Sequence, residues 1–310
     1  MTTQTQSDSR ITKLKEKRTS TNVGLSLTQL ALRRLRRDKL TIIALSVLIV
    51  LTILSFLAPF ISNTLLHVSH THTNVSNKFQ PIGAEGHLLG TDDLGRDHLA
   101  RLLYAGRISL GIAFSAAILS LSIGLSFGIV SGYHGGIIDD VFNWLITTLD
   151  SIPGLFLLLI ISAVLSPGPA TLILVLGFLG WTGTMRLIRG ETFSLREREY
   201  VVSARAIGAS NWRIMFTHIA PNVISISVVT LMVTIGNLIL VESALSFLGL
   251  GVKAPTPTWG NMLTGAQTFF SIKSARHLVV MPGLLISITV LCLYIIGDGL
   301  RDAFDPTTRD

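Results

Sequence analysis

Charged residues are scarce in this chain. Asp, Glu, Lys and Arg make up 14% of its 310 residues, whereas hydrophobic residues make up 49%. A soluble domain has about 25% charged residues, because water must cover its surface. With a mean hydropathy of +0.59, this chain lacks the polar surface to cover itself, so lipid must cover the rest. The composition excludes an ordinary soluble domain and predicts an integral membrane protein.

Cysteine is almost absent as well. The only one, Cys292, lies in an apolar run, so the chain has no internal disulfide and no cysteine-based metal site. A cleavable signal peptide is not expected, because the polar, basic residues 1–39 precede the first apolar run. The formal net charge of +7 then indicates basic residues on the cytoplasmic side of a membrane rather than a nucleic-acid-binding surface.

Long apolar runs are what the chain does have. A spanning helix needs about 20 mostly apolar residues, because each residue rises ~1.5 Å across a hydrocarbon core of ~30 Å. The predicted fold class is therefore all-α, a polytopic membrane protein with six transmembrane helices. The predicted spans are residues 40–61, 108–133, 141–166, 167–185, 223 to about 250, and 278–297.

The basic residues predict the orientation of these spans. With the N-terminus inside, most of the 25 Lys and Arg residues fall on the cytoplasmic side, so both termini are expected to be cytoplasmic. The chain then divides into a cytoplasmic tail with a basic amphipathic helix (1–39), a first span (40–61), an extracytoplasmic segment (62–107), a five-helix core (108–306) with a cytoplasmic loop at 186–221, and a C-terminal tail (307–310).

The cytoplasmic loop predicts a helix, a glycine turn and a second helix. Its middle part reads Glu-Tyr-Val-Val-Ser-Ala-Arg-Ala-Ile-Gly and ends at Gly208. Small residues at Ser203 and Ala204 suit a helix that another surface approaches closely. Gly208 suits the turn that ends this helix, because a left-handed C-cap costs glycine little. Residues 209–216 predict a second short helix before Pro221 opens the next span.

This loop resembles the coupling-loop (EAA) motif of the permease subunits of binding-protein-dependent ABC importers. The family pattern is Glu-Ala-Ala, three residues, Gly, nine residues, then Ile-x-Leu-Pro. The pair Ser203-Ala204, Gly208 and Pro221 fall at this spacing. The version in dipeptide, oligopeptide and nickel importers is more similar than the general pattern. The residues that depart from the general pattern are Val202, Ser203, His218 and Ala220.

Further stretches, in order along residues 33–306, resemble the same importers. They are similar to the second of the two permease subunits, the one with six spans. These stretches are Leu-Leu-Gly-Thr-Asp-Asp-Leu-Gly-Arg-Asp at 88–97, Gly-Tyr-His-Gly-Gly at 132–136 followed by Asp139, Glu-Ser-Ala-Leu-Ser-Phe-Leu-Gly-Leu-Gly at 242–251, Trp-Gly at 259–260, and Gly-Asp-Gly-Leu-Arg-Asp-Ala-Phe-Asp-Pro at 297–306.

The resemblance implies a type I ABC importer permease fold in the cell membrane of a prokaryote. Besides the lipid bilayer, the implied partners are a second permease subunit, two ATPase subunits and an extracytoplasmic solute-binding protein. Closure of the ATPases on ATP would act through the loop at 199–221 and change which conformation of the channel is favoured. The residues that the resemblance implies for this contact are Glu199, Tyr200, Ser203, Ala204, Arg205, Gly208, Ala209 and Pro221.

The chain has no Gly-x-x-x-x-Gly-Lys-Ser/Thr phosphate loop, so ATP hydrolysis is expected in a partner subunit. We therefore expect no catalytic residue, no cofactor and no nucleic-acid partner. The solute is open among dipeptides, longer peptides, nickel chelates and related small molecules.

Charged residues inside a span are costly and are functional candidates by default. Asp150 lies in the third span, close to Pro153. It either lines the translocation path or satisfies backbone polar groups that the proline leaves unpaired, and the second, structural role is favoured. Glu242, near a span end, suits helix packing or pairing with a basic residue. Three polar residues share a face of the fifth span that suits helix packing or channel lining equally, namely Thr230, Thr234 and Asn237.

The expected outer face has two polar clusters. Asp92, Asp93, Arg96 and Asp97 would lie where a solute-binding protein docks, or would fix the loop by local ion pairs. A second cluster, with histidines at 67, 70 and 72, could bind a metal, but a solvated loop is the commoner case and no metal site is predicted.

Two other classes of membrane protein are alternatives. A self-sufficient ion-coupled secondary transporter would show paired repeats or broken helices with ion ligands, and Asp150 near Pro153 is the one hint of these. A membrane enzyme would need a catalytic cluster, and neither His-Glu-x-x-His nor Gly-x-Ser-x-Gly occurs in the chain.

Overall fold

The computed structural model describes residues 32–165 and 168–304. Within these residues the chain is helical, and extended backbone pairs only at two isolated bridges, Ala84 with His87 and Thr91 with Asp97. The all-α prediction is therefore confirmed. Most of the expected N-terminal amphipathic helix, the tail before it and the C-terminal tail lie outside the described residues.

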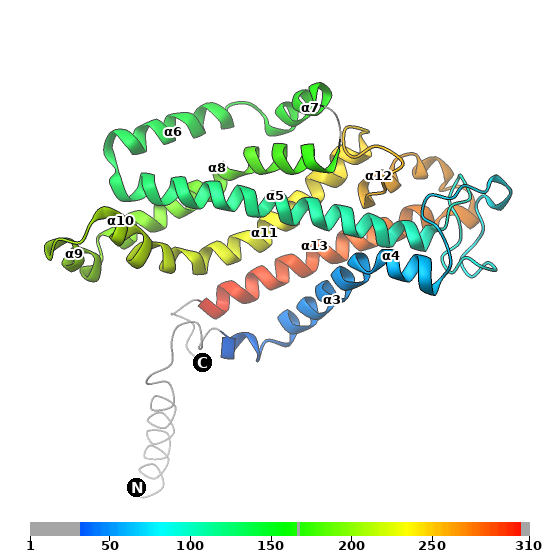
Figure 1. The fold of residues 1–310 in the computed structure, drawn as a ribbon, viewed down its shortest axis with the longest axis horizontal. Coiled ribbons are helices and arrows are strands. Elements are labelled where there is room, and N and C mark those ends of the chain that lie inside the picture. The colour runs from blue at the N-terminus through cyan, green and yellow to red at the C-terminus, as the bar shows by residue number, and fades with distance from the viewer. Residues whose placement is uncertain (1–31, 166–167, 305–310) are drawn as a thin grey trace, which may run out of the picture.

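Five long helices run side by side along the molecule (Figure 1). Among the described residues, five helical segments are long and apolar enough to cross a membrane. They correspond to five of the six predicted spans. These helices are α3 (Lys39–Phe56), α5 (His98–His134), α8 (Pro169–Arg196), α11 (Ala220–Phe247) and α13 (His277–Phe304).

The predicted third span, residues 141–166, is not one helix. It is divided between α6 (Gly136–Asp150) and α7 (Gly154–Val164). At ~1.5 Å per residue these helices are about 22 and 16 Å long, each short of a ~30 Å hydrocarbon core. Pro153 causes the break, because it has no backbone N–H and disfavours a helical conformation in the residue before it. Among the described residues, five of the six predicted spans are thus single long helices, and the predicted third span is two shorter ones.

Two helices extend beyond the predicted spans. Helix α5 begins at His98 rather than at residue 108, because Asp97 caps it by accepting a hydrogen bond from the backbone N–H of Ala100 at 2.7 Å. Its 37 residues span about 55 Å, so it extends beyond the bilayer. Helix α8 continues to Arg196, so the first part of the expected loop at 186–221 is helical and belongs to α8.

Short elements connect the long helices. Between α3 and α5 lie α4 (Ala58–Phe60), the π-helical turn η1 (Ile61–Leu65) and the 3-10 turn η2 (Val75–Asn77). Between α8 and α11 lie α9 (Glu199–Ala206), α10 (Asn211–Arg213) and the π-helical η3 (Ile214–Ile219). Between α11 and α13 lie α12 (Trp259–Leu263), η4 (Ala266–Phe269) and η5 (Lys273–Ala275).

A stripe of glycines on α5 lets α8 approach closely. A Cβ atom placed on Gly128 would lie 2.8 Å from the Cβ of Ile188, and one on Gly132 would lie 2.7 Å from the Cβ of Thr192. Gly124 meets Thr184 in the same way. Each contact joins residues 60 positions apart, so the two helices run parallel. Small residues at four-residue spacing are a common helix-packing device in membranes, and here they set the seam between α5 and α8.

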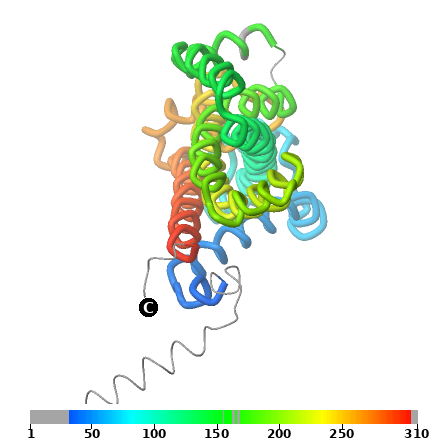
Figure 2. Tube along the Cα trace, turned by 90° about the vertical axis from the view of Figure 1, so that its left-hand side faces the viewer, coloured from blue at the N-terminus to red at the C-terminus, as the bar shows by residue number. Residues whose placement is uncertain are grey.

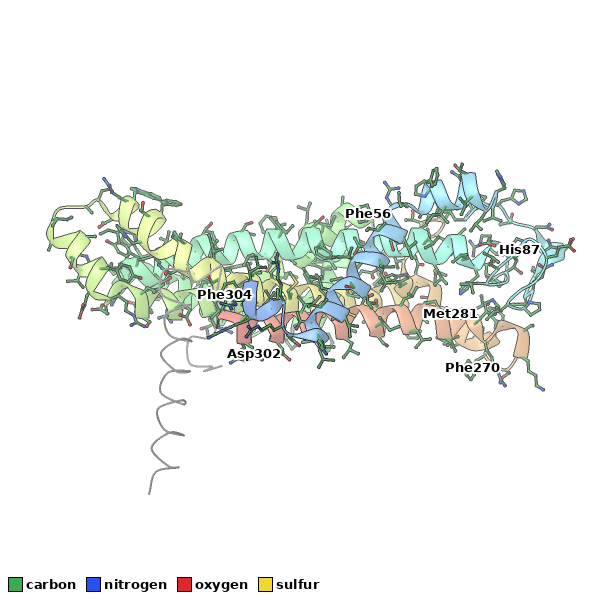
Figure 3. The ribbon with its side chains drawn as sticks, turned by 90° about the horizontal axis from the view of Figure 1, so that it is seen from below. Phe56, His87, Phe270, Met281, Asp302 and Phe304 are labelled. Carbon is green, nitrogen blue, oxygen red and sulfur yellow. The ribbon has the colours of Figure 1, made fainter. Side chains whose placement is uncertain are left out.

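The two ends of the bundle are different. One end carries the connections before α5 and after α11, with His87 and Phe270 at its tip (Figure 3). The opposite end carries α9 and α10 (Figure 1). The start of α3 and the end of α13 also lie toward this end, where Gly299 packs closely against Thr41. Seen end-on, α6 and α7 lie on one side of the bundle and α3 with α13 on the other (Figure 2).

Candidate functional site

The coupling loop, residues 199–221, has the helix and glycine turn that the sequence predicts. Helix α9 ends at Ala206, and Gly208 follows with φ +84°. The N–H of Ala209 then donates to the carbonyl of Ala204 at 3.0 Å. A positive φ strains any residue with a Cβ, so glycine is needed at this turn.

The second half of the coupling loop differs from the prediction. Residues 209–216 do not form a separate helix, because α10 leads through η3 directly into α11. Pro221 lies in the first turn of α11, where a proline that opens a helix is expected. The continuous helical segment runs from Asn211 to Phe247.

One face of the coupling loop is buried against its own chain. Val201 and Ala204 are buried, and they belong to an apolar cluster with residues of α5, α8 and η3 that includes Ile129, Ile188 and Ile214. Ala204 therefore packs against its own chain, whereas the sequence predicted that this small residue faces a partner. The larger apolar side chains on the outside of the loop are Tyr200, Val202, Ile207, Trp212 and Phe216.

Polar contacts fix both arms of the loop on the end of α5. The hydroxyl of Tyr133 donates to Asn211 Oδ1 at 2.9 Å, and the guanidinium carbon of Arg205 lies 5.5 Å from the centre of the Tyr133 ring. A few residues away, Arg189 of α8 makes a two-pronged ion pair with Asp139 of α6, with Arg189 Nη2 at 2.5 Å from Asp139 Oδ2. The loop is thus held by the side chain of Tyr133 in α5, and the Arg189–Asp139 pair joins α8 to α6 beside it.

Of the residues in these contacts, sequence reasoning singled out only Asp139 and Arg205. Tyr133 and Asn211 are 78 positions apart, and Asp139 and Arg189 are 50 apart. Tyr133 and Asp139 do lie in a stretch that resembles the importer family. This resemblance was the one feature of the sequence that pointed to these two residues.

Asp150 forms an ion pair that sequence reasoning missed. Its carboxylate accepts a hydrogen bond from Arg186 Nη2 of α8, rather than serving the backbone groups around Pro153. The two side chains are 37% and 51% exposed, with Arg186 the more exposed. Asp150 also lines a cavity of about 320 Å³ between the α6–α7 break, α8 and α11.

The other intramembrane candidates lie apart from Asp150. Thr230 donates to the carbonyl of Ile226 at 3.0 Å within its own helix. Asn237 is exposed, and its Oδ1 accepts from the hydroxyl of Tyr294 at 2.7 Å. Thr234 is half-buried. These three are not brought into the cavity beside Asp150.

Glu242 is fully buried and holds three helices together. Its carboxylate accepts from Ser109 Oγ of α5 at 3.1 Å and from Ser246 Oγ at 2.7 Å. Ser109 Oγ in turn accepts from the backbone N–H of Trp259 in α12 at 3.1 Å. Of the two roles that the sequence left open, helix packing matches these contacts, because serine hydroxyls rather than a basic residue meet the carboxylate. Because a buried charge needs such partners, Glu242 joins α5, α11 and α12.

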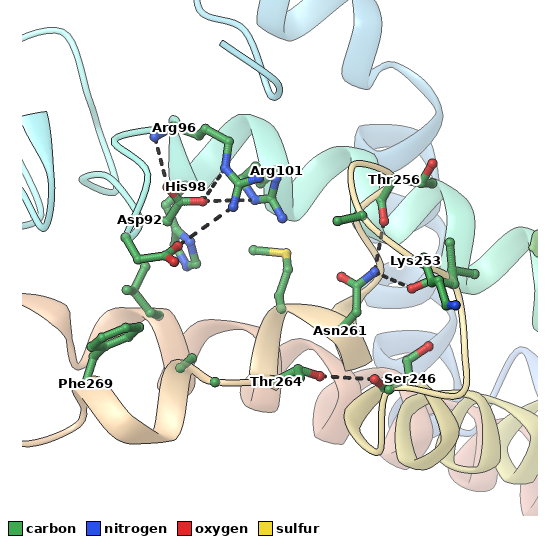
Figure 4. Close-up of a pocket in the computed structure, with 18 of the residues that line it drawn as sticks. Asp92, Arg96, His98, Arg101, Ser246, Lys253, Thr256, Asn261, Thr264 and Phe269 are labelled. Atoms are coloured by element: carbon green, nitrogen blue, oxygen red, sulfur yellow. Dashed lines mark hydrogen bonds and ion pairs between the residues drawn. The ribbon is translucent and has the colours of Figure 1, made fainter. Parts of the chain in front are cut away.

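The acidic and basic residues at the other end of the bundle form local pairs (Figure 4). Asp92 accepts from Arg96 Nε at 2.7 Å and lies 3.3 Å from Arg101 Nε. Asp97 caps α5 and pairs with His87 Nδ1 at 2.8 Å. Asp93 makes a longer pair, with Oδ1 at 3.8 Å from Arg96 Nη2, and its side chain is 44% exposed. Of the three candidate docking acids, Asp93 is the most exposed.

A cavity of about 440 Å³ lies beside these pairs, between the start of α5 and the connection after α11 (Figure 4). Arg96, Arg101 and Lys253 line it, together with the buried imidazole of His98. In the neighbouring loop, the ring of His70 stacks on that of Tyr104 at 3.7 Å. Burial, and secondarily Arg101, lowers the pKa of His70. Among the described residues, no three His, Cys, Asp or Glu side chains are grouped so as to hold a metal ion.

Two family models match the chain. One is described as binding-protein-dependent transport system inner membrane component, and it matches residues 124–310. The other is described as the N-terminal TM domain of oligopeptide transport permease C, and it matches residues 26–81. The first match contains the whole coupling loop, the α5–α8 seam and the cavity beside Asp150.

Curated relatives are similar along most of the chain. The dipeptide transport system permease protein DppC of Alkalihalophilus pseudofirmus is 37% identical over 279 residues, which is 90% of each chain. The oligopeptide transport system permease protein OppC of Bacillus subtilis is 35% identical over 286 residues, 92% of each chain. The glutathione transport system permease protein GsiD of Pectobacterium atrosepticum is 37% identical over 226 residues, 73% of this chain and 74% of that one. The chain therefore belongs to the family of binding-protein-dependent transport system inner membrane components.

Proposed function

We propose that this chain is one half of the translocation channel of an ATP-driven importer of peptides. Its other half would be a second, different permease subunit, and two ATPase subunits would dock at the end that carries α9 and α10. A solute-binding protein would deliver the peptide at the opposite end. The names of relatives such as DppC and OppC support peptides as the solute.

The exposed apolar surface of the coupling loop is the observation that carries this proposal. Ile207 is 87% exposed at the tip of the glycine turn, and Trp212 stacks on Phe216 at 5.5 Å beside it. An apolar patch outside the membrane commonly marks a protein-interaction site. Because α10 continues into α11, movement of a partner docked here would reach the channel.

The orientation of the chain follows from the same assignment. The start of α3, the end of α13 and the coupling loop lie toward one end of the bundle, which would be the cytoplasmic end. Helices α6 and α7 would together complete the sixth crossing, with their break inside the membrane. The conformational coupling would be this chain's own task, and ATP hydrolysis would belong to the partners.

Purification of the tagged chain tests the proposal. We expect a second permease and two ATPase subunits to co-purify, and the complete complex in liposomes to import a radiolabelled dipeptide only with ATP and the binding protein. Robust uptake by this chain alone would contradict the proposal and would favour a self-sufficient transporter. Site-directed Ile207→Asp should leave assembly of the two permeases intact while reducing capture of the ATPases.

A further inference from the structure

The cavity beside Asp150 is apolar on most of its wall. It has a volume of about 320 Å³, and leucines from α7 and α8 line it together with Leu238 and Val241 of α11. Thr182 is a polar exception on α8. Small-molecule sites are typically apolar cavities of about 300–1,000 Å³ with a few polar groups at fixed places. This cavity matches the lower end of that range.

Both signs of charge lie together at the edge of this cavity. Asp150 is part of its wall. Arg186, which pairs with Asp150, comes four residues after Thr182 and therefore lies about one helical turn away along α8. Since both side chains keep a substantial exposed fraction in the isolated chain, either could exchange its partner for a charged group of a ligand.

This face of the bundle is unsuited to lipid. An ion pair is costly against hydrocarbon, and the non-helical backbone between α6 and α7 leaves polar groups that lipid cannot satisfy. Such backbone occurs at membrane depth only where it is buried in protein or lines a water-filled path. On the proposed function, in which α6 and α7 cross the membrane, the break and the ion pair must therefore face the path or the second permease.

We propose that Asp150, Arg186 and the adjoining cavity form a subsite for a short zwitterionic peptide. The peptide's ammonium group would bind Asp150, its carboxylate would bind Arg186, and an apolar side chain would enter the cavity. One ion pair is thus exchanged for two, which compensates for the loss of water around the peptide's ends. Because the Asp150–Arg186 pair has no net charge, the subsite fits a net-neutral zwitterion better than an anion or a cation. This inference rests on the proposed function.

Photo-crosslinking tests the subsite directly, without relying on delivery by the binding protein. The complete transporter would be illuminated with alanyl-photoleucine at millimolar concentration, and the adducts would be located by mass spectrometry. We expect adducts on the segments 154–158, 176–182 and 238–241 that competing alanyl-leucine reduces at least fivefold. Adducts elsewhere only, or adducts that alanyl-leucine does not reduce, would overturn the proposal.

A pair of glycine variants provides the matched control. Gly154 lines the cavity, and a Cβ atom there would meet nothing within 4 Å, so Gly154→Leu can begin a side chain in open space at the cavity wall. Gly111 of α5 is equally open but does not line the cavity. Gly154→Leu should reduce both the adducts and the import of alanyl-leucine at least fivefold, and Gly111→Leu should leave both within twofold. Equal effects of the two variants would contradict the subsite.

Charge variants separate ligand binding from a purely structural ion pair. The double variant D150N/R186Q should reduce import of alanyl-leucine about tenfold while ATP hydrolysis stimulated by the binding protein stays within twofold. The exchange D150R/R186D keeps an ion pair but reverses its direction, so import should stay low. Full rescue by the exchange would assign the pair a structural role and overturn the proposal. If the wild type itself imports no dipeptide, the proposed function fails instead.

Discussion

Gly128 of α5 lies directly against Ile188 of α8, and a Cβ atom on this glycine would come 2.8 Å from the Cβ of Ile188 and 3.0 Å from the carbonyl oxygen of Met185. The backbone oxygen cannot rotate away as a side chain can. The seam between α5 and α8 therefore depends on the absence of a side chain at this position, and it carries the coupling loop at its end.

Gly128→Ala should destabilise the protein. Overpacking of a well-packed contact costs about 1–3 kcal/mol, which exceeds the gain of roughly 0.5–1 kcal/mol that alanine brings over glycine within a helix. Gly111→Ala, on the same helix but open to space, should be neutral or stabilising. Thermal unfolding of the detergent-solubilised complex measures both, and a lower melting temperature for Gly111→Ala than for Gly128→Ala would contradict the close seam.

Neighbouring small residues of α9 should respond in opposite ways. Ala204 is buried under its own chain and Ser203 is exposed. Ala204→Trp should lower the melting temperature, because its ring does not fit beneath the loop, whereas Ser203→Trp should leave the melting temperature unchanged. Ser203→Trp should instead reduce capture of the ATPases and ATP-dependent uptake. Wild-type uptake by Ser203→Trp would show that this face of α9 meets no partner.

Substitutions of two adjacent aspartates at the other end of the bundle should affect different properties, stability for Asp92 and docking of the binding protein for Asp93. Asp92→Asn removes the nearer carboxylate partner of Arg96 and the carboxylate that pairs with Arg101, so it should destabilise the protein by about 1–3 kcal/mol. Asp93 lies 3.8 Å from Arg96 Nη2, and its side chain is 44% exposed. Exposed ion pairs contribute little to stability, so Asp93→Asn should change stability by less than about 0.5 kcal/mol.

Asp93→Asn should nevertheless weaken capture of the binding protein, because it removes a charge from the docking surface. The effect should be clearest at low salt, since salt screens interactions between exposed charges. Titration of the binding protein against the reconstituted complex at two salt concentrations measures this. Unchanged affinity at both would exclude Asp93 from the docking surface.

The local features of the fold follow from sequence, and the distant ones do not. Apolar runs identify the five long helices, and Gly208 identifies the turn in the coupling loop. Asp97 before a helical pattern is a recognisable capping residue, so the start of α5 at His98 could also be predicted from the sequence. Pro153 is visible in the sequence as a helix-disrupting residue, but the apolar run around it still favoured one span rather than the two helices α6 and α7.

The pairs that build the candidate site have no local signature. Asp150 and Arg186 are 36 positions apart, and Ser109 and Glu242 are 133 apart. Such pairs depend on the rotation and depth of helices packed against one another, which apolar periodicity alone does not determine. For the same reason, sequence could place Ala204 on a helix but could not decide which way it faces.

His70 predicts how stability depends on pH. Its pKa is lowered from the ordinary value of 6.5, first by burial and then by Arg101. The unfolded chain therefore binds a proton more readily than the folded one, so stability should fall as pH drops below about 6.5, and the loss should be complete once pH passes the folded pKa. His70→Phe keeps a ring against Tyr104 and removes the titration. Melting temperatures between pH 7.5 and 5 should decline less steeply for His70→Phe than for the wild type, and parallel declines would exclude His70 as the cause.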